Sequence, residues 1–325
     1  MDGEISFENI LQARQALKDI SYITPIVTNR DLEAIASASV FLKCETAQRT
    51  GSFKFRGAYY AAMRVKTEGL SQAVVTISSG NHGQGLALAA KLLGLSAHVI
   101  VPRPFVQRKY HAIVQYGAHV IPVDDRASAD QILRHTIGLE SAWPIHAFND
   151  PHVIAGQGTI LLELLQQVNN LDAVLAPVGE GGLLSGLCIA AHHLKPHLSL
   201  YACEPLGAAD VSESLRRNEI VPMTNPMTLA DGLRTSLGNR TLPILKRHLT
   251  DVFLVSEEEI LAGMRFSQET LKLDIEPSSA VALAPLLRRE PALAGKRVGV
   301  VLTGGNVEMD VLLRSTLTRK ETSPD

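Results

Sequence analysis

The stretch AVVTISSGNHGQGLALAAKLL, residues 73–93, places a strand, a polar turn and a helix in immediate succession. Its first five residues are mostly apolar and mostly β-branched, which is typical of a strand covered on both faces of a parallel sheet. A polar run follows at 78–85, and apolar residues recur at helical spacing over 83–93. This order predicts an α/β sheet with polar groups at the carboxyl end of a strand, where open α/β folds bind ligands.

The same alternation continues along most of the chain. Short apolar runs predict further strands at 40–44, 98–101, 119–123, 173–178, 199–203 and 298–302. Helical periodicity predicts further helices at 105–116, 128–139, 159–168, 182–194, 256–270 and 278–287. Ser256 and Glu259 have the spacing of a helix capping box. Strands that alternate with helices favour an α/β fold with mostly parallel sheets flanked by helices.

Length, charge and hydropathy narrow the class of protein. At about 150 residues per domain, the 325 residues predict two domains, and a net charge of −2 argues against a nucleic-acid-binding protein. The most apolar stretch, 86–102, is interrupted by Lys91 and His98 and is shorter than the about 20 apolar residues of a membrane span. The N-terminus lacks the pattern of a secretory signal. We therefore expect no nucleic-acid or membrane partner.

The cysteines are few, widely spaced and without a C-x-x-C pair. An odd number of isolated cysteines among apolar neighbours predicts buried free thiols, not a disulfide framework or a zinc site, at Cys44, Cys188 and Cys203. We therefore expect a cytoplasmic protein. Residues 318–325 are polar and predict a loose tail.

The run TGSFKFRGA, residues 50–58, contains a lysine between two phenylalanines. Desolvation lowers the pKa of a lysine and favours its neutral, nucleophilic form. Lys54 is therefore a candidate for a Schiff base with a carbonyl compound. The alternative is a lysine whose stem lies along a helix while its ammonium reaches water, and the residues alone leave both open.

Two polar strand ends are candidate ligand sites. The run SSGNHGQG, 78–85, has more polar and glycine residues than one helix cap requires, although turn and cap chemistry selects the same residue types. The run GEGGLLSG, 179–186, precedes a predicted helix whose N-terminus favours an anion. Leu184 replaces the third glycine of a dinucleotide-binding pattern. This run predicts a phosphate cup, with a packing turn as the alternative.

Two further strand ends carry weaker signals. TGGN, 303–306, follows the last predicted strand. Glu204 and Asp210 lie in a predicted loop and could hold Mg²⁺ or Ca²⁺, although loop carboxylates are more often solvated. One desolvated lysine, one phosphate cup and several strand-end motifs fit a phosphorylated aldehyde cofactor held by the lysine.

In this order, the segments KCE, QRTGSFKFRGA, SSGNHGQG, PVGEGGLLSG, ACEP, LADGLR and TGGNV resemble the serine/threonine dehydratase and serine racemase family. These are fold-type II enzymes that use pyridoxal 5′-phosphate (PLP), and the resemblance spans about residues 7–313. It implies two open, twisted, mostly parallel sheets flanked by helices. It also implies a large PLP-binding domain of residues 1–50 and 147–325, a small domain of residues 51–146 inserted in it, a cofactor in the cleft between them, and a homodimer.

The family pattern assigns roles to individual residues. Lys54 would form the Schiff base, with Phe53 and Gly232 against the two faces of the cofactor ring. Asn81 would bind the 3′-oxygen of the ring, and Thr303 would lie beside its nitrogen. The backbone of one loop would bind the phosphate, through Gly179, Glu180, Gly181, Gly182 and Leu183.

The resemblance also implies a substrate site and a cation site. Ser79 matches the acid–base residue on the second face of the racemases. The substrate carboxylate would bind at Ser78, Ser79, Asn81 and His82. Glu204, the carbonyl of Ala208 and Asp210 match the Mg²⁺ or Ca²⁺ site of the racemase-like branch, which reverses the expectation of two solvated carboxylates.

Two residues and the C-terminus depart from the family pattern. Glu180 replaces a glycine in the phosphate loop, which places a carboxylate near an anion. Thr303 stands where serine is commoner. The chain ends soon after the last motif, so we expect no regulatory domain of the kind found in biosynthetic threonine dehydratases and no feedback by isoleucine.

The implied reaction is β-elimination from a small 3-hydroxy amino acid, such as L-serine, L-threonine or 3-hydroxyaspartate, to a 2-oxo acid and ammonia. Lys54 would remove the Cα proton while the cofactor accepts the electrons. Racemisation through Ser79 is the alternative within the family, and β-replacement fits the motifs less well. A nicotinamide oxidoreductase is opposed by the glycine spacing, and a non-catalytic binding protein by Lys54. The sequence does not select the substrate.

Overall fold

The computed structural model describes residues 4–308 and 311 of the chain. Contacts between residues group the chain into two compact units. The described residues of the first unit lie within Met1–Ile23, Gln48–Glu163 and Gly181–Lys195, and those of the second within Thr24–Ala47, Leu164–Glu180 and Pro196–Asp325. Each unit is therefore assembled from three separate stretches of the chain.

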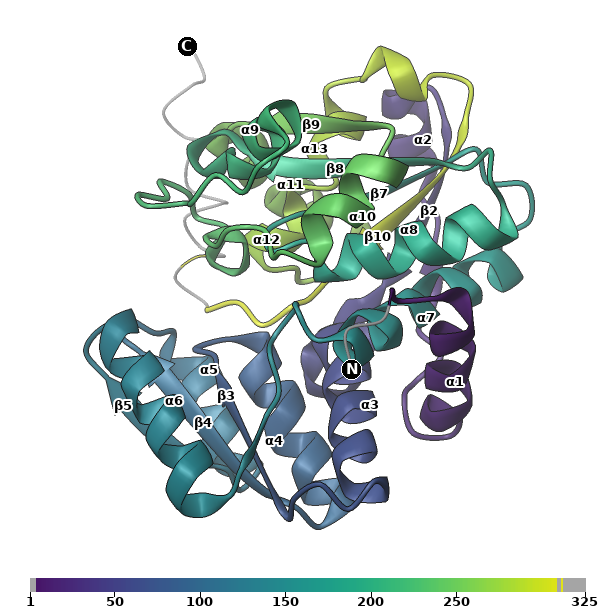
Figure 1. The fold of residues 1–325 in the computed structure, drawn as a ribbon. Helices are drawn as coiled ribbons and strands as arrows, with labels where there is room; N and C mark the ends of the chain where they lie inside the picture. The colour runs from purple at the N-terminus through teal and green to yellow at the C-terminus, as the bar shows by residue number, and fades with distance from the viewer. Residues whose placement is uncertain (1–3, 309–310, 312–325) are drawn as a thin grey trace. The chain divides into compact units, whose positions relative to one another are not determined.

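The first unit contains a four-stranded parallel sheet with the strand order β5–β4–β3–β6, of which Figure 1 labels β3, β4 and β5. Its strands are β3 (Ala73–Ile77), β4 (Ser96–Pro102), β5 (His119–Val123) and β6 (Trp143–Pro144). Its helices include α1 (Phe7–Leu17), α3 (Lys54–Thr67), α4 (Asn81–Leu93), α5 (Gln107–Gln115), α6 (Arg126–Glu140), most of α7 (Pro151–Gln167) and α8 (Gly182–Leu194).

Helices cover both faces of this sheet, which explains its continuous apolar strands. Val74 packs with α3 and α4 on one face, and its neighbour Val75 packs on the other face with Ala129 of α6. In β4, Val99 packs with α4 and α5 while Ile100 joins the cluster of α6. Successive side chains of a strand point to opposite faces, so neighbouring positions such as Val74 and Val75, or Val99 and Ile100, are all apolar.

The second unit contains a six-stranded sheet with the order β1–β2–β10–β7–β8–β9, parallel except for the pair β1–β2. Its strands are β1 (Ile26–Val27), β2 (Ser39–Cys44), β7 (Ala173–Pro177), β8 (Ser199–Pro205), β9 (Asp251–Val255) and β10 (Arg297–Leu302). Its helices include α2 (Arg30–Ala36), α9 (Asp210–Arg217), α10 (Thr241–His248), α11 (Glu257–Phe266), α12 (Pro277–Ala280) and α13 (Ala284–Leu287). The α/β fold with two mostly parallel sheets is thus confirmed.

The predicted strands are all present, and each begins and ends within two residues of its predicted bounds. Three strands were not predicted. β1 and β6 have only two residues each, too few to form a pattern, and β9 begins with a charged residue. β8 continues through Pro205, so Glu204 lies on a strand and the prediction that it lies in a loop is wrong.

The predicted helices differ more at their ends. α7 begins at Pro151, eight residues before its predicted start, because Asp150 accepts hydrogen bonds from the backbone N–H groups of His152 and Val153 and so caps the helix. The capping box of Ser256 and Glu259 is confirmed. The helix it begins ends at Phe266 and continues as one π-helical turn. The predicted helix 278–287 is divided into α12 and α13.

Other expectations have mixed outcomes. The three cysteines are buried and free, as predicted. In the part of the chain that the structure describes, no helix is long and apolar enough to cross a membrane. The predicted polar tail at 318–325 lies outside the described residues. The predicted boundaries of the inserted domain, 51–146, stay a prediction, although the four-stranded sheet is built entirely from residues within them.

Candidate active site

Lys54 is the first residue of α3, at the N-terminal end of the helix. Its ammonium donates a hydrogen bond to the carbonyl of Ala147 at 3.4 Å and lies 5.4 Å from the centre of the Phe53 ring. Phe55 is fully buried in the core beneath α3. The side chain of Lys54 is half-buried. Of the two flanking phenylalanines, Phe53 is therefore the one placed beside the ammonium.

The polar run after β3 forms a tight turn into α4. Ser78 is fixed to β4 by a bond from its N–H to the carbonyl of Ile100 at 2.9 Å. Its hydroxyl accepts hydrogen bonds from the N–H groups of Gly80 at 3.2 Å and Gly83 at 3.0 Å. Ser78 thus supplies the local cap of α4, while Ser79 and Asn81 remain half-buried at the same turn.

The structure brings Lys54 and this turn together within the first unit. A Cβ on Gly85 of α4 would lie 3.2 Å from backbone atoms of Lys54 and Phe55 in α3. Glycine at this position therefore permits the close approach of α3 and α4. His82 is 2% exposed, and neither ring nitrogen makes a hydrogen bond of normal geometry with the described residues, although the backbone of Ile145 is near enough to act on its pKa. Its pKa is held well below the usual value by burial and by the positive charges of Lys54 and His146.

The loop between β7 and α8 has the geometry of an anion site. Gly181 is the N-cap of α8 with a φ of +87°, and no side chain of the described residues caps the helix. A Cβ on Gly182 would lie 3.0 Å from the Cβ and the carbonyl oxygen of Phe148. The hydroxyl of Ser185 in the first turn is buried without a partner in the described part of the chain. An uncapped helix N-terminus that requires glycine is suited to a phosphate group.

In the second unit, the two residues predicted to lie beside the cofactor ring, Gly232 and Thr303, are in ordered turns. Gly232 is in a 3₁₀ turn, and its N–H donates to the hydroxyl of Ser278 at 2.9 Å. Thr303 follows β10 and is buried. The next residue, Gly304, accepts a hydrogen bond from the N–H of Glu276 at 3.0 Å. These bonds hold the two turns against the segment at 276–278.

Glu204 and Asp210 are buried carboxylates, 0% and 3% exposed, and are not solvated. The Glu204 carboxylate accepts hydrogen bonds from the N–H groups of Val211 at 2.6 Å and Ser212 at 3.0 Å. Neither oxygen of Asp210 accepts a hydrogen bond of normal geometry from the described residues, although the N–H of Leu237 is near enough to lower its pKa. Burial outweighs these contacts and raises the pKa of both carboxyls to about 7.

These two acids fit a cation site. Unpaired, buried carboxylate oxygens are costly unless a positive charge compensates them, and carboxylate and carbonyl oxygens are the ligands of Mg²⁺ and Ca²⁺. Ala208 is buried between the two acids in the chain. Among the described residues, no group of three or more His, Cys, Asp or Glu side chains is close enough to hold a metal ion.

The predicted residues are thus divided between the units. The first holds Phe53, Lys54, Ser78, Ser79, Asn81, His82, Gly181, Gly182 and Leu183. The second holds Gly179, Glu180, Glu204, Ala208, Asp210, Gly232 and Thr303. Four contacts join residues far apart in the chain and were therefore not anticipated. They are those of Lys54 with the Ala147 carbonyl, Gly182 with Phe148, the Glu180 carbonyl with the Thr241 hydroxyl, and Gly232 with Ser278.

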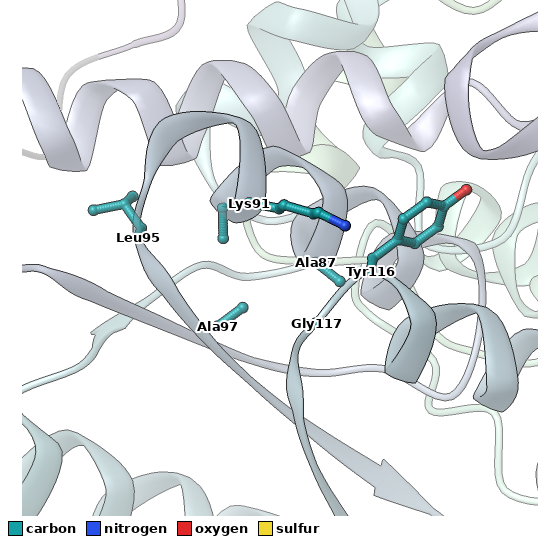
Figure 2. Close-up of a pocket in the computed structure, with 7 residues that line it drawn as sticks. Ala87, Lys91, Leu95, Ala97, Tyr116 and Gly117 are labelled. Carbon is teal, nitrogen blue, oxygen red and sulfur yellow. The ribbon is translucent and has the colours of Figure 1, made fainter.

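A separate pocket of about 150 Å³ lies in the first unit, away from these residues. It is lined by α4, β4 and the end of α5, and Figure 2 shows the amine of Lys91 directed toward Tyr116. None of the predicted site residues lines it.

The fold and these sites define a family of enzymes. The family model described as "Pyridoxal-phosphate dependent enzyme" matches residues 17–304, so the chain belongs to this family. The match includes the lysine, both polar loops, the acids and the turn at Gly232.

The names of similar proteins describe two kinds of reaction, racemisation and ammonia elimination. A serine racemase from Dictyostelium discoideum is 43% identical over 310 residues, 94% of this chain and 96% of the relative. An L-threo-3-hydroxyaspartate ammonia-lyase from Pseudomonas sp. is 39% identical over 94% of this chain and 96% of the relative. The crystal structure of a threonine deaminase from T.th. superposes with a TM-score of 0.89 at 37% identity, covering 94% and 99% of the two chains.

Proposed function

We propose that this protein is a PLP-dependent ammonia-lyase that eliminates water from a small 3-hydroxy amino acid and releases a 2-oxo acid and ammonia. The observation that carries the proposal is the position of Lys54 at the start of α3, beside the polar turn at 78–81. A lysine amine and a carboxylate-binding turn are the groups that this chemistry requires. The ammonia-lyase and deaminase relatives act on substrates of this class by name.

The residues of this chain fit the cofactor. When bound, PLP supplies an electron sink for the Cα carbanion. The N-terminus of α8 would hold its phosphate through backbone N–H groups, and Phe53, Asn81, Gly232 and Thr303 would contact its ring. Ser78, Ser79, Asn81 and His82 would orient the substrate carboxylate. Lys54 would take the Cα proton at its Nζ, where the Ala147 carbonyl now accepts a hydrogen bond.

A panel of 3-hydroxy amino acids tests the proposal. The purified protein, with PLP, would be supplied with L-serine, L-threonine and the isomers of 3-hydroxyaspartate, and 2-oxo acid and ammonia would be measured. We expect equal amounts of both products from at least one substrate. Chirality of the remaining substrate would be measured in the same samples. If the protein releases ammonia from none of these substrates, the lyase assignment is wrong.

Racemisation is the second candidate, because the racemase from D. discoideum is 43% identical. Ser79 would return a proton to the face opposite Lys54. Ser79→Ala should then abolish racemisation and leave elimination measurable, since elimination requires no second-face proton donor. Ser71→Ala, a change at a partly exposed serine that donates to the Ser141 carbonyl, is the matched control. Equal loss of both activities would contradict the role of Ser79.

We further propose that Mg²⁺ or Ca²⁺ binds at Glu204, the Ala208 carbonyl and Asp210. The Asp210 carboxylate supports the site, because it is buried and accepts no hydrogen bond of normal geometry from the described residues. The cation would order the segment that leads to Gly232. Chelation should lower activity or thermal stability, and Mg²⁺ should restore it. The double change Glu204→Gln, Asp210→Asn should abolish this response, whereas full activity after exhaustive chelation would exclude a functional site.

We also propose a cytoplasmic homodimer. Three buried free thiols are suited to a reducing compartment, and dimers are usual in the family that the sequence resembles. Light scattering on the purified protein tests the oligomeric state, with a mass of twice 35.1 kDa expected. Localisation of a tagged copy in cells tests the compartment.

A further inference from the structure

We propose that Lys109 is a positioning residue for the substrate, whose buried ammonium attracts the carboxylate of the amino acid to the turn at 78–81. The inference rests on the proposed function and adds a cationic residue to its substrate site. Its starting point is the burial of Lys109, which is 2% exposed although it lies in the first turn of α5.

The fold brings the first turns of α4 and α5 to one edge of the sheet. β3 and β4 are parallel neighbours, with Ile77 opposite Ile100, and α4 follows β3 as α5 follows β4. The two helices also pack against each other, since a Cβ on Gly83 of α4 would lie 3.0 Å from the Ile113 side chain of α5. The turn at 78–81 and the first turn of α5 are therefore neighbours.

The side chain of Lys109 reaches that turn. Its Cδ lies 4.0 Å from the position that a Cβ on Gly80 would occupy. The ammonium is two bonds beyond Cδ, so the positive charge is close to Gly80. Because Lys109 is almost completely buried, little water screens this charge, and its action on a nearby anion is strong.

An anion at the turn would offset several unfavourable features of this arrangement. The N-termini of α4 and α5 carry partial positive charge, and a cation in the first turn of a helix is unfavourable. Burial adds a desolvation cost to the charge of Lys109. A carboxylate bound at the turn reduces both costs, and the substrate of the proposed function carries such a group.

The arrangement assigns different ends of the substrate to two lysines of the first unit. Lys109 acts on the carboxylate, and Lys54 acts at Cα. Gly85 of α4 packs against the backbone of Lys54, so α4 holds the turn at a fixed distance from the start of α3. An amino acid whose carboxylate lies at the turn is therefore oriented with respect to Lys54.

Two ligands that differ in the carboxyl group test the inference without an activity assay. L-Alanine and L-alaninamide have the same side chain, and neither has a leaving group on Cβ. Their affinities for the holoenzyme are read from the change in the visible absorption of the bound cofactor. We expect the unaltered protein to bind L-alanine about tenfold more tightly than L-alaninamide, because only L-alanine has a charge that Lys109 attracts.

Lys109→Met removes the charge and keeps an apolar side chain of similar length. Its affinity for L-alanine should fall about tenfold, while its affinity for L-alaninamide changes less than about twofold. Lys109→Gln should give the same result and provides the test if Lys109→Met does not fold. Lys109→Arg, which keeps the charge, should retain the preference for L-alanine. Lys91→Met removes an equal charge from an exposed position on α4 and should change neither affinity.

The outcomes separate this inference from the function on which it rests. If the neutral variants weaken both ligands equally, or neither ligand, Lys109 serves the fold alone and the inference is wrong. It is also wrong if the unaltered protein binds L-alanine and L-alaninamide equally, a result that requires no variant. If the unaltered protein binds no PLP, the proposed function itself is wrong.

Discussion

Arg56 and Glu163 form a two-pronged ion pair inside the first unit, with nitrogen–oxygen distances of 2.6 and 2.9 Å. Arg56 is fully buried, and its guanidinium also donates to the carbonyl of Tyr22 at 3.3 Å. Arg56 lies two residues after Lys54 on α3, and Glu163 lies on α7. The pair therefore joins the helix that begins with Lys54 to a helix about a hundred residues further along the chain.

Glu163→Gln should destabilise the protein by about 3 kcal/mol, because removal of one partner leaves a buried charge uncompensated. The free energy of unfolding from urea denaturation checks this value. Glu68→Gln, at the C-terminal end of α3, is the matched control, since Glu68 pairs with Arg64 in partly exposed surroundings. Surface pairs contribute about 0–1 kcal/mol, so equal losses for the two variants would contradict the special role of the buried pair.

Gly182→Ala should weaken PLP binding at least tenfold, a loss of about 1.4 kcal/mol. The added Cβ would lie 3.0 Å from Phe148, so the N-terminus of α8 must move away from the position at which we propose that it binds phosphate. Overpacking should also cost about 1–3 kcal/mol of stability. Titration of the protein with PLP, followed by visible absorption, measures the affinity.

Gly138→Ala is the control for that change. Gly138 lies inside α6 with nothing within 4 Å of its added Cβ, so alanine should raise stability by up to about 1 kcal/mol and leave PLP affinity unchanged. PLP affinity that is equal in the two variants would remove the support for a phosphate site at α8.

The buried His82 should make stability depend on pH below neutrality. Its folded-state pKa is lowered, so the unfolded chain takes up a proton near pH 6.5 that the folded protein does not bind. This contribution to stability is complete above pH 6.5 and is lost as the pH falls. Between pH 7.5 and 5.5 the loss is about 1.4 kcal/mol for one such group.

His82→Gln should remove that part of the pH dependence, measured as urea unfolding at the two pH values. His197→Gln, a change at an exposed histidine, should leave it in place. An unaltered pH dependence in His82→Gln would show that His82 takes up a proton equally in the folded and unfolded states.

Lys54→Ala should abolish the covalent attachment of PLP that borohydride reduction makes permanent. It should also abolish the visible absorption of the lysine-bound cofactor. Peptide mapping by mass spectrometry after reduction identifies the labelled residue. Lys91→Ala, at the pocket beside Tyr116, should keep both properties. A labelled lysine other than residue 54 would overturn the assignment.

Much of this protein was predictable from local patterns. The apolar runs of the two sheets have side chains for both faces, and most of them end where polar or glycine residues begin. The order of these strands along the chain and the sheet edges that we expect to bind ligands were therefore evident from the sequence. The sequence also singled out Lys54, because an ammonium beside an aromatic residue at a helix start is unusual. The motifs in their order determined the family.

Only the tertiary structure decided what depends on distant residues. Phe53 and Phe55 are equivalent in the sequence, but packing of α3 buries Phe55 and leaves Phe53 at the ammonium. In the sequence, Glu204 and Asp210 have the pattern of solvated loop acids. In the structure, β8 and the helices around it bury both side chains. The bond from Gly232 to Ser278 joins residues 46 positions apart. Periodicity in the sequence shows which face of a helix or strand is apolar. Which side chains are buried, and which charges lie near them, depends on which elements pack together, and the whole fold sets that packing.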